Sequence, residues 1–323
     1  MSARGREDLV GVISMRASAD DGHLLPRRCS ALAARAGLRG ASLRGRLSLA
    51  IVLGGLAALA LSPAALASGG EPREVQYGAS PLEIANVYPS STSGSPVVVL
   101  VHGGGWRQQR DLSRLELSSR ALQAEGFTVY EIDYEQDSSE TPAFPLEPDD
   151  VIAATRWAIA HAAAYNGNPG DVTLLGGSAG GNLAALAVEQ LDEESPGAVE
   201  GVVLLSAPTN LVALAPMLGE QITYQPFVGA FHWALDWEQG EPFPEAYAAR
   251  WSPALHAPSH NCPSWLIFNG ETELIPLSQA QEMQDSLTHA GCQSTLEVVP
   301  GGEHAFAYFH RVKPEIFSFI RGQ

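Results

Sequence analysis

Three short segments contain the residue types that covalent hydrolysis requires. Segment 102–106 reads His-Gly-Gly-Gly-Trp, segment 176–182 reads Gly-Gly-Ser-Ala-Gly-Gly-Asn, and segment 301–306 reads Gly-Gly-Glu-His-Ala-Phe. The middle segment places Ser178 in a G-x-S-x-G pattern, in which small residues flank a serine on a strained turn between a strand and a helix. A serine held in such a turn can attack a carbonyl carbon if a histidine accepts its proton.

The partners of Ser178 should follow it in the chain. His304 stands in a loop after the last predicted strand and is the candidate proton acceptor, although a chance loop histidine is an alternative among nine in the chain. The acid is expected after the penultimate strand, where segment 268–276 contains no Asp and offers Glu271 and Glu273. Glu303 is discounted because side chains adjacent in sequence do not usually face one another.

Glycine-rich turns could stabilise the negative charge that develops on the carbonyl oxygen when the serine attacks. Three successive glycines in segment 102–106 leave backbone N–H groups unobstructed, and such groups can bind a developing oxyanion. We expect His102 to be structural in this turn. A plain glycine-rich turn is the alternative for this segment. A phosphate-binding turn is the alternative for segment 176–182, but no Lys follows it and no G-x-G-x-x-G pattern fits.

Apolar strands and amphipathic helices alternate along the chain, which predicts a doubly wound, mostly parallel sheet of about eight strands. In such sheets functional residues gather at the carboxyl ends of the strands. The predicted strands are 75–77, 82–88, 97–101, 128–132, 172–175, 202–205, 265–268 and 295–299, and the predicted helices are 112–125, 149–165, 179–191 and 278–290. Gly126, Gly167 and Gly291 are expected to cap helices.

The first 67 residues are not expected to belong to the fold. Segment 27–46 is rich in Arg, and segment 47–67 is uncharged and ends in Ala-Leu-Ala, which is the order of a cleavable export signal. A permanent membrane anchor formed by segment 47–67 is the main alternative, since 21 uncharged residues can just cross a bilayer, and a buried core helix is a third. Both leading interpretations place segment 68–323 outside the cytosol.

The net charge argues against some classes of binding partner. The first 67 residues carry a net charge of +5, whereas the remainder carries ten basic and 32 acidic residues, a net charge of −22. A segment this acidic is a poor binder of nucleic acid or anionic membranes.

Three cysteines exclude a disulfide-dense scaffold, but Cys262 and Cys292 each precede one of two neighbouring predicted strands. We therefore expect these two to form a disulfide in an exported protein.

The chain resembles secreted α/β-hydrolase esterases of the hormone-sensitive-lipase-like group, closest to the bacterial feruloyl-esterase-like and acetyl-esterase-like branch. The resemblance covers residues 75–310. It rests on HGGGW at 102–106, Phe144-Pro145, Asp150, Arg156-Trp157, YNGNP at 165–169, GGSAGGNLAAL at 176–186 and GGEHAF at 301–306.

The resemblance implies an α/β-hydrolase fold and assigns site residues. Ser178 would be the nucleophile, His304 the general base and Glu273, three residues after Gly270, the acid. Gly103, Gly104 and Ala179 would supply the oxyanion-hole N–H groups, and no metal or organic cofactor is implied. Two positions depart from the family pattern: Gly177 stands where a polar residue is common, and Glu273 stands where Asp is usual.

The expected function is hydrolysis of small carboxylic esters, acetyl to butyryl, including aryl or sugar-linked esters, through an acyl-enzyme. Segment 207–257 is rich in aromatic residues and would cover the substrate pocket, although a satellite hydrophobic cluster is an alternative. No long apolar lid helix is evident, which favours a small-ester esterase over an interfacial lipase. The alternatives are an aryl formamidase-type amidase and a non-catalytic binding protein that retains the fold.

Overall fold

The computed structural model describes residues 69–107, 112–136, 142–238, 240–258 and 262–323, with only the backbone described at 112–114. The predicted export segment, 1–67, lies outside the described residues. Within the described ranges, no helix is both long enough and apolar enough to cross a membrane.

An eight-stranded sheet forms the centre of the described part, in the order β1-β2-β4-β3-β5-β6-β7-β8. The strands are β1 (Arg73–Gln76), β2 (Ile84–Tyr88), β3 (Ser95–Val101), β4 (Thr128–Ile132), β5 (Gly167–Gly177), β6 (Gly201–Leu205), β7 (Ser264–Gly270) and β8 (Ser294–Val299). Strands β1 and β2 pair antiparallel, and β2 also pairs antiparallel with β4. Strands β3 to β8 are mutually parallel, which confirms the doubly wound, mostly parallel sheet.

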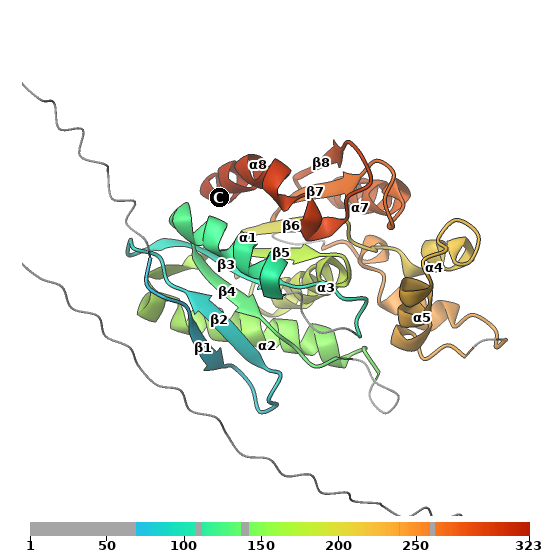
Figure 1. Ribbon diagram of the computed structural model, residues 1–323, viewed down its shortest axis with the longest axis horizontal. Helices are drawn as coiled ribbons and strands as arrows, with labels where there is room; N and C mark the ends of the chain where they lie inside the picture. The colour runs from blue at the N-terminus through green and yellow to red at the C-terminus, as the bar shows by residue number, and fades with distance from the viewer. Residues whose placement is uncertain (1–68, 108–111, 137–141, 239, 259–261) are drawn as a thin grey trace, which may run out of the picture. The chain divides into compact units, whose positions relative to one another are not determined.

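Helices cover both faces of the sheet, because the central strands are apolar on both sides. The principal helices are α1 (Leu112–Ala124), α2 (Leu146–His161), α3 (Ala179–Glu194), α7 (Leu277–Ala290) and α8 (Phe309–Arg321). Val97, Val99 and Val101 of β3 belong to the buried cluster that contains α2, α3 and α7 residues. Val98 and Leu100 belong to the opposite cluster, which is covered by α1 and α8 (Figure 1).

Strand register brings the predicted functional segments to one edge of the sheet. Val101 of β3 pairs with Gly176 of β5, so the turn at 102–106 and the turn at Ser178 begin at the same level. Leu205 of β6 pairs with Gly177 on one side and Phe268 on the other. The carboxyl ends of β3, β5, β6 and β7 therefore meet at this edge, as expected for a functional site in a parallel sheet.

The predicted helix 149–165 is α2 followed by a short 3-10 helix, and three further differences from the sequence prediction have a clear physical reason. Strand β5 begins at Gly167 rather than at residue 172, because Gly167 pairs with Ser95 across a register shift in β3. The left-handed residue after the short 3-10 helix η1 (Ala162–Tyr165) is Asn166, with φ of 67°, and not Gly167. Helix α8 was not predicted, although Val312, Ile316 and Ile320 give it an apolar stripe with helical spacing.

The aromatic-rich segment 207–257 folds as short helices. These are α4 (Leu211–Leu214), η2 (Ala215–Met217), α5 (Gln225–Ala234), α6 (Glu245–Arg250) and η3 (Pro253–Leu255). Figure 1 shows α4 and α5 to one side of the sheet. Phe227 and Phe231 of α5 are buried and lie close to Trp106, so this segment packs onto the turn that follows β3.

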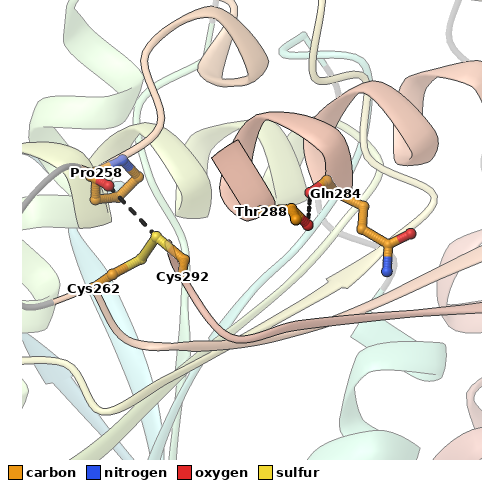
Figure 2. The surroundings of a disulfide bond; sticks show 5 residues. All are labelled: Pro258, Cys262, Gln284, Thr288 and Cys292. Atoms are coloured by element: carbon orange, nitrogen blue, oxygen red, sulfur yellow. Dashed lines mark hydrogen bonds between the residues drawn. A yellow bond between two sulfur atoms is a disulfide. The ribbon is translucent and has the colours of Figure 1, made fainter. Parts of the chain in front are cut away.

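A disulfide joins Cys262 and Cys292, the two cysteines expected to pair. Figure 2 shows the bond where the chain enters β7 and β8, and the two Cα atoms are 5.5 Å apart. Parallel neighbours have their amino ends side by side, and this arrangement brings together residues that are 30 positions apart.

Candidate active site

Ser178 occupies a strained turn between β5 and α3. Its φ of 55° and ψ of −128° lie outside the regions that non-glycine residues usually adopt. The glycines around it are required by close packing: a Cβ on Gly176 would lie 2.3 Å from the carbonyl oxygen of Gly180. The backbone N–H of Ser178 donates to the carbonyl of Leu205 at 2.8 Å, which fixes the turn to β6. The serine is thus presented at the end of the sheet on a rigid backbone.

Glu273 and His304 are brought together from the loops after β7 and β8. The Nδ1–H of His304 donates to Oε2 of Glu273, and the carboxylate side chain is fully buried while the imidazole is 29% exposed. This contact leaves the other imidazole nitrogen for the nucleophile side, and His304 and Ser178 line the same cavity. The arrangement is that of a base oriented by an acid.

The structure distinguishes Glu273 from the two other carboxylates that the sequence offered. Oε1 of Glu273 accepts hydrogen bonds from the N–H of Gly270 at 2.7 Å and from the hydroxyl of Ser206 at 2.6 Å. Glu271 is exposed, and its backbone N–H donates to the carbonyl of Val299. Glu303 lies 3.2 Å from Arg311, an exposed ion pair. Only Glu273 of the three contacts His304.

The glycine turn after β3 lies directly against the turn that carries Ser178. A Cβ on Gly103 would be 2.7 Å from the carbonyl oxygen of Gly177 and 3.0 Å from the Cβ of Ser178. Gly103 and Gly104 line the cavity together with Ser178. Ala179 is the first residue of α3, where helix N–H groups have no intrahelical acceptor and the helix dipole is positive. Gly103 and Gly104 thus lie beside Ser178, and Ala179 directly follows it, so these three residues remain the candidates for an oxyanion hole.

Gly177 has a structural reason for departing from the family pattern. A Cβ at this position would lie 2.6 Å from a ring carbon of Phe306 and 3.3 Å from the Cβ of Ala305. The loop that carries His304 thus packs onto the backbone before Ser178. A polar side chain at 177 would need the Phe306 ring to move, so glycine and Phe306 are matched to each other here.

His102 has a structural position, as expected. Its ring is buried, with Nε2 3.1 Å from Oδ1 of Asp133 and Nδ1 2.6 Å from the carbonyl oxygen of Gly103. The ring also stacks on Tyr134, whose hydroxyl donates to the backbone carbonyl of His102 at 2.8 Å. These contacts hold the start of the glycine turn in place.

A cavity of about 590 Å³ opens over Ser178. Its wall combines the glycine turn, Arg107, the loop of His304 and apolar side chains from α1 and α5, and the greater part of its lining surface is apolar. The apolar lining residues include Leu115, Tyr224, Phe227, Ala230, Leu274 and Phe306. A pocket of this size and character suits a small organic ligand.

Sequence reasoning did not identify two residues next to the site. Ser206 follows β6 without any motif, and its hydroxyl contacts Glu273 and Tyr308. Burial raises the pKa of Tyr308 well above its ordinary value, so this hydroxyl stays protonated and can donate. No short-range signal could have found these contacts, because Ser206 is 67 residues from Glu273 and 102 residues from Tyr308.

Comparisons with known proteins agree with this architecture. A family model described as alpha/beta hydrolase fold matches residues 98–308. The probable carboxylic ester hydrolase LipM of Mycobacterium tuberculosis is 24% identical over 67% of this chain and 50% of its own length. The acetyl-hydrolase of Streptomyces hygroscopicus is 28% identical over 71% of this chain and 74% of its own length.

Solved structures give the same result for the fold. The esterase of Pyrobaculum calidifontis superposes with a TM-score of 0.64 at 21% identity, covering 80% of this chain and 87% of that one. The chain spans about half the length of the first curated relatives that it matches. The family model covers both glycine-rich turns and the loop of His304, and the chain therefore belongs to the α/β-hydrolase fold family.

Proposed function

We propose that this protein is a serine esterase that cleaves small carboxylic esters through an acyl-enzyme. The observation that carries the proposal is the pairing of Glu273 with His304 beside a cavity that Ser178 shares. The names of the relatives, a carboxylic ester hydrolase and an acetyl-hydrolase among them, support the same reaction class.

Acylation involves all of these groups. Ser178 Oγ attacks the ester carbonyl carbon while Nε2 of His304 accepts the hydroxyl proton, and the C=O π electrons move onto oxygen. The N–H groups of Gly103, Gly104 and Ala179 stabilise the resulting oxyanion. When the tetrahedral intermediate collapses, the C–O bond to the alcohol breaks and the imidazolium returns its proton to the departing oxygen. Glu273 stabilises the imidazolium throughout.

Deacylation repeats the sequence with water. His304 accepts a proton from a water molecule that attacks the acyl carbon, the same N–H groups hold the second oxyanion, and Ser178 leaves with the proton from the imidazolium. The products are the free acid and the regenerated serine. The exposed edge of the His304 imidazole gives water a route to this position.

The expected substrates carry short acyl groups. Helix α5 covers one side of the cavity but is short. Its Phe227 and Phe231 are buried against Trp106, which differs from the exposed apolar face of a lipase lid. A Cβ on Gly105 would lie 3.0 Å from Ala230, so α5 also packs against the glycine turn itself. This fixed wall favours acetyl to butyryl groups, with aryl or sugar-linked alcohols as leaving groups.

We also propose that the protein acts outside the cytosol. The Arg-rich segment 27–46 followed by the uncharged segment 47–67 has the order of an export signal, whether it is cleaved or kept as an anchor. The pairing of Cys262 with Cys292 supports this location, because structural disulfides persist in oxidising compartments. Fractionation of the full chain expressed in a bacterium tests the location, and a cytosolic product in which Cys262 and Cys292 are both reduced would refute it.

The activity is tested with p-nitrophenyl esters from C2 to C16, methyl ferulate and N-formylkynurenine. The proposal predicts ester turnover by the wild type, with a loss of about 10⁵–10⁶ in kcat for Ser178→Ala. Turnover of N-formylkynurenine without ester hydrolysis would select the aryl formamidase alternative. Ligand binding without any turnover would select a non-catalytic binding protein. Folding of the variant is verified by circular dichroism.

A further inference from the structure

One buried hydroxyl, from a separate part of the chain, hydrogen-bonds both to Glu273 and to the loop that carries His304. Ser206 directly follows β6 and is fully buried. Its Oγ lies 2.6 Å from Oε1 of Glu273 and 3.0 Å from the backbone nitrogen of Ala305, the residue after His304. It also lies 2.7 Å from the hydroxyl of Tyr308. A single oxygen atom thus connects the acid, the loop of the base and a tyrosine.

The direction of each hydrogen bond follows from the number of protons available. An ionised carboxylate only accepts, so Ser206 donates its single proton to Glu273. The N–H of Ala305 can only donate, and Ser206 Oγ accepts it. Tyr308 must then be the donor in its contact with Ser206, and the more distant carbonyl of Phe268, at 3.2 Å, shares this single proton. The donors form an ordered series that ends on the carboxylate.

The backbone conformation of Ser206 also indicates a role for its hydroxyl. Its φ of 54° lies in the left-handed region, which a serine adopts at a cost and a glycine adopts freely. The turn itself is held by the Ser206 N–H, which donates to the carbonyl of Phe268 at 2.8 Å. Glycine would therefore meet the conformational requirement of this backbone position without strain. What serine adds at this position is its hydroxyl. Strained residues of this kind cluster at functional sites.

We infer that Ser206 is a positioning residue for the catalytic pair: its hydroxyl stabilises the ionised carboxylate of Glu273, directs Oε2 toward His304 and fixes the loop of His304 through Ala305. This role rests on the proposed ester hydrolysis. It also fits the use of Glu rather than Asp at 273, because the longer side chain has one more torsion that must be held.

The role predicts a change in the pH dependence of the reaction. Among the described residues, Glu273 is faced by His304 on Oε2, by the Gly270 N–H and Ser206 on Oε1, and more distantly by the neutral Tyr308. Removing the Ser206 donor leaves the carboxylate less stabilised, so the pair binds a proton more tightly. In the wild type, kcat/KM should rise with pH as the pair loses this proton. In a variant without the Ser206 hydroxyl, the same rise should occur at higher pH.

The test compares Ser206→Gly, which relieves the backbone, with Ser206→Ala, which does not. For hydrolysis of p-nitrophenyl butyrate, both should lose about tenfold to hundredfold in kcat/KM, the range expected for a hydrogen bond to a charged group. The acidic limb of the kcat/KM profile should move upward by about half to one pH unit. Tyr308→Phe should move it in the same direction by less. Ser252→Ala is the control, because Ser252 is equally buried and bridges two backbone groups away from the catalytic residues.

Two results would overturn the inference. Folded Ser206→Gly protein with wild-type kcat/KM and an unmoved acidic limb would remove any role for the hydroxyl. A loss of activity with an unmoved limb, matched by Ser252→Ala, would reduce Ser206 to a structural residue. Proton NMR of the Nδ1–H between His304 and Glu273 gives a readout that needs no turnover: its titration midpoint must shift in both Ser206 variants even if the esters prove to be the wrong substrates.

Discussion

The indole Nε1–H of Trp106 donates a hydrogen bond to Oδ1 of Asn182 across 3.3 Å. Trp106 ends the glycine turn after β3, and Asn182 lies one helical turn after Ser178 on α3. The amide nitrogen of Asn182 in turn donates to the carbonyl of Trp251 at 3.1 Å. One buried amide therefore connects the proposed oxyanion hole, the helix of the nucleophile and the aromatic-rich segment.

Replacing Asn182 with Leu should lower kcat for p-nitrophenyl butyrate by about tenfold with little change in KM, because the glycine turn loses its fixed distance from Ser178. The folded state should lose about 1–3 kcal/mol, since the indole N–H and the Trp251 carbonyl stay buried without partners. Steady-state kinetics and urea unfolding measure the two effects. Asn166→Gly is the control: it removes a bond to the Ser90 carbonyl at the amino edge of the sheet and should leave kcat unchanged. An equal kcat loss in both variants would argue against a specific link.

Chain-length preference follows from the fixed position of α5. We expect greater kcat/KM for C4 than for C16 p-nitrophenyl esters, because Phe227 and Phe231 are packed against Trp106 and Phe227 closes this side of the cavity. Shortening the wall with Phe227→Ala should extend activity toward C8 esters. Initial rates below the critical micelle concentration measure this. Higher activity on C16 than on C4, with activation at an oil–water interface, would contradict it.

The parts of the site that the sequence predicts are those built from local pattern. Ser178 and Gly103 stand in motifs whose backbone demands are visible in the residues themselves, since only small residues fit where 2.3 Å and 2.7 Å approaches occur. The central strands β3, β4, β6 and β7 could be predicted because burial on both faces produces continuous apolar runs, and the structure shows these strands almost fully buried. The disulfide partners could be expected because parallel neighbours share an amino edge.

The parts that escaped prediction depend on distant contacts. Ser206 is one serine after an apolar strand, and its importance arises only when the loops after β7 and β8 fold around it. Helix α8 contains Pro314, which argues against a helix, while its apolar stripe argues for one. Burial of that stripe against the sheet decides the outcome.

The disulfide should stabilise the fold without affecting catalysis. Cys262→Ser combined with Cys292→Ser should lower the free energy of unfolding by about 3–4 kcal/mol, the chain-entropy value for a loop of 30 residues. Activity on p-nitrophenyl butyrate at 25 °C should stay within about twofold of the wild type. Urea titrations with and without dithiothreitol measure the effect. The wild type should respond to the reductant and the double variant should not, and insensitivity of both would refute the bridge.

The two glutamates after β7 allow a matched test of the acid. Glu273 has a buried carboxylate that accepts from Gly270, Ser206 and His304, whereas Glu271 is exposed and lies two residues earlier. The same substitution at both positions removes one negative charge from the same loop. Any difference between the two variants therefore reports contact with His304 rather than the loss of charge.

Glu273→Gln should lower kcat by about 10³–10⁴, because an amide cannot stabilise the imidazolium and can select the wrong tautomer of His304. Glu271→Gln should cost less than about tenfold. Both variants should keep the wild-type circular dichroism spectrum, since glutamine retains the shape and an acceptor oxygen for the N–H of Gly270. Glu273→Asp should fall between the wild type and Glu273→Gln, because the charge is kept but the carboxylate is withdrawn by one methylene. The reverse ranking would transfer the role to Glu271, and two unaffected variants would show that Ser178 and His304 work without a carboxylate from this loop.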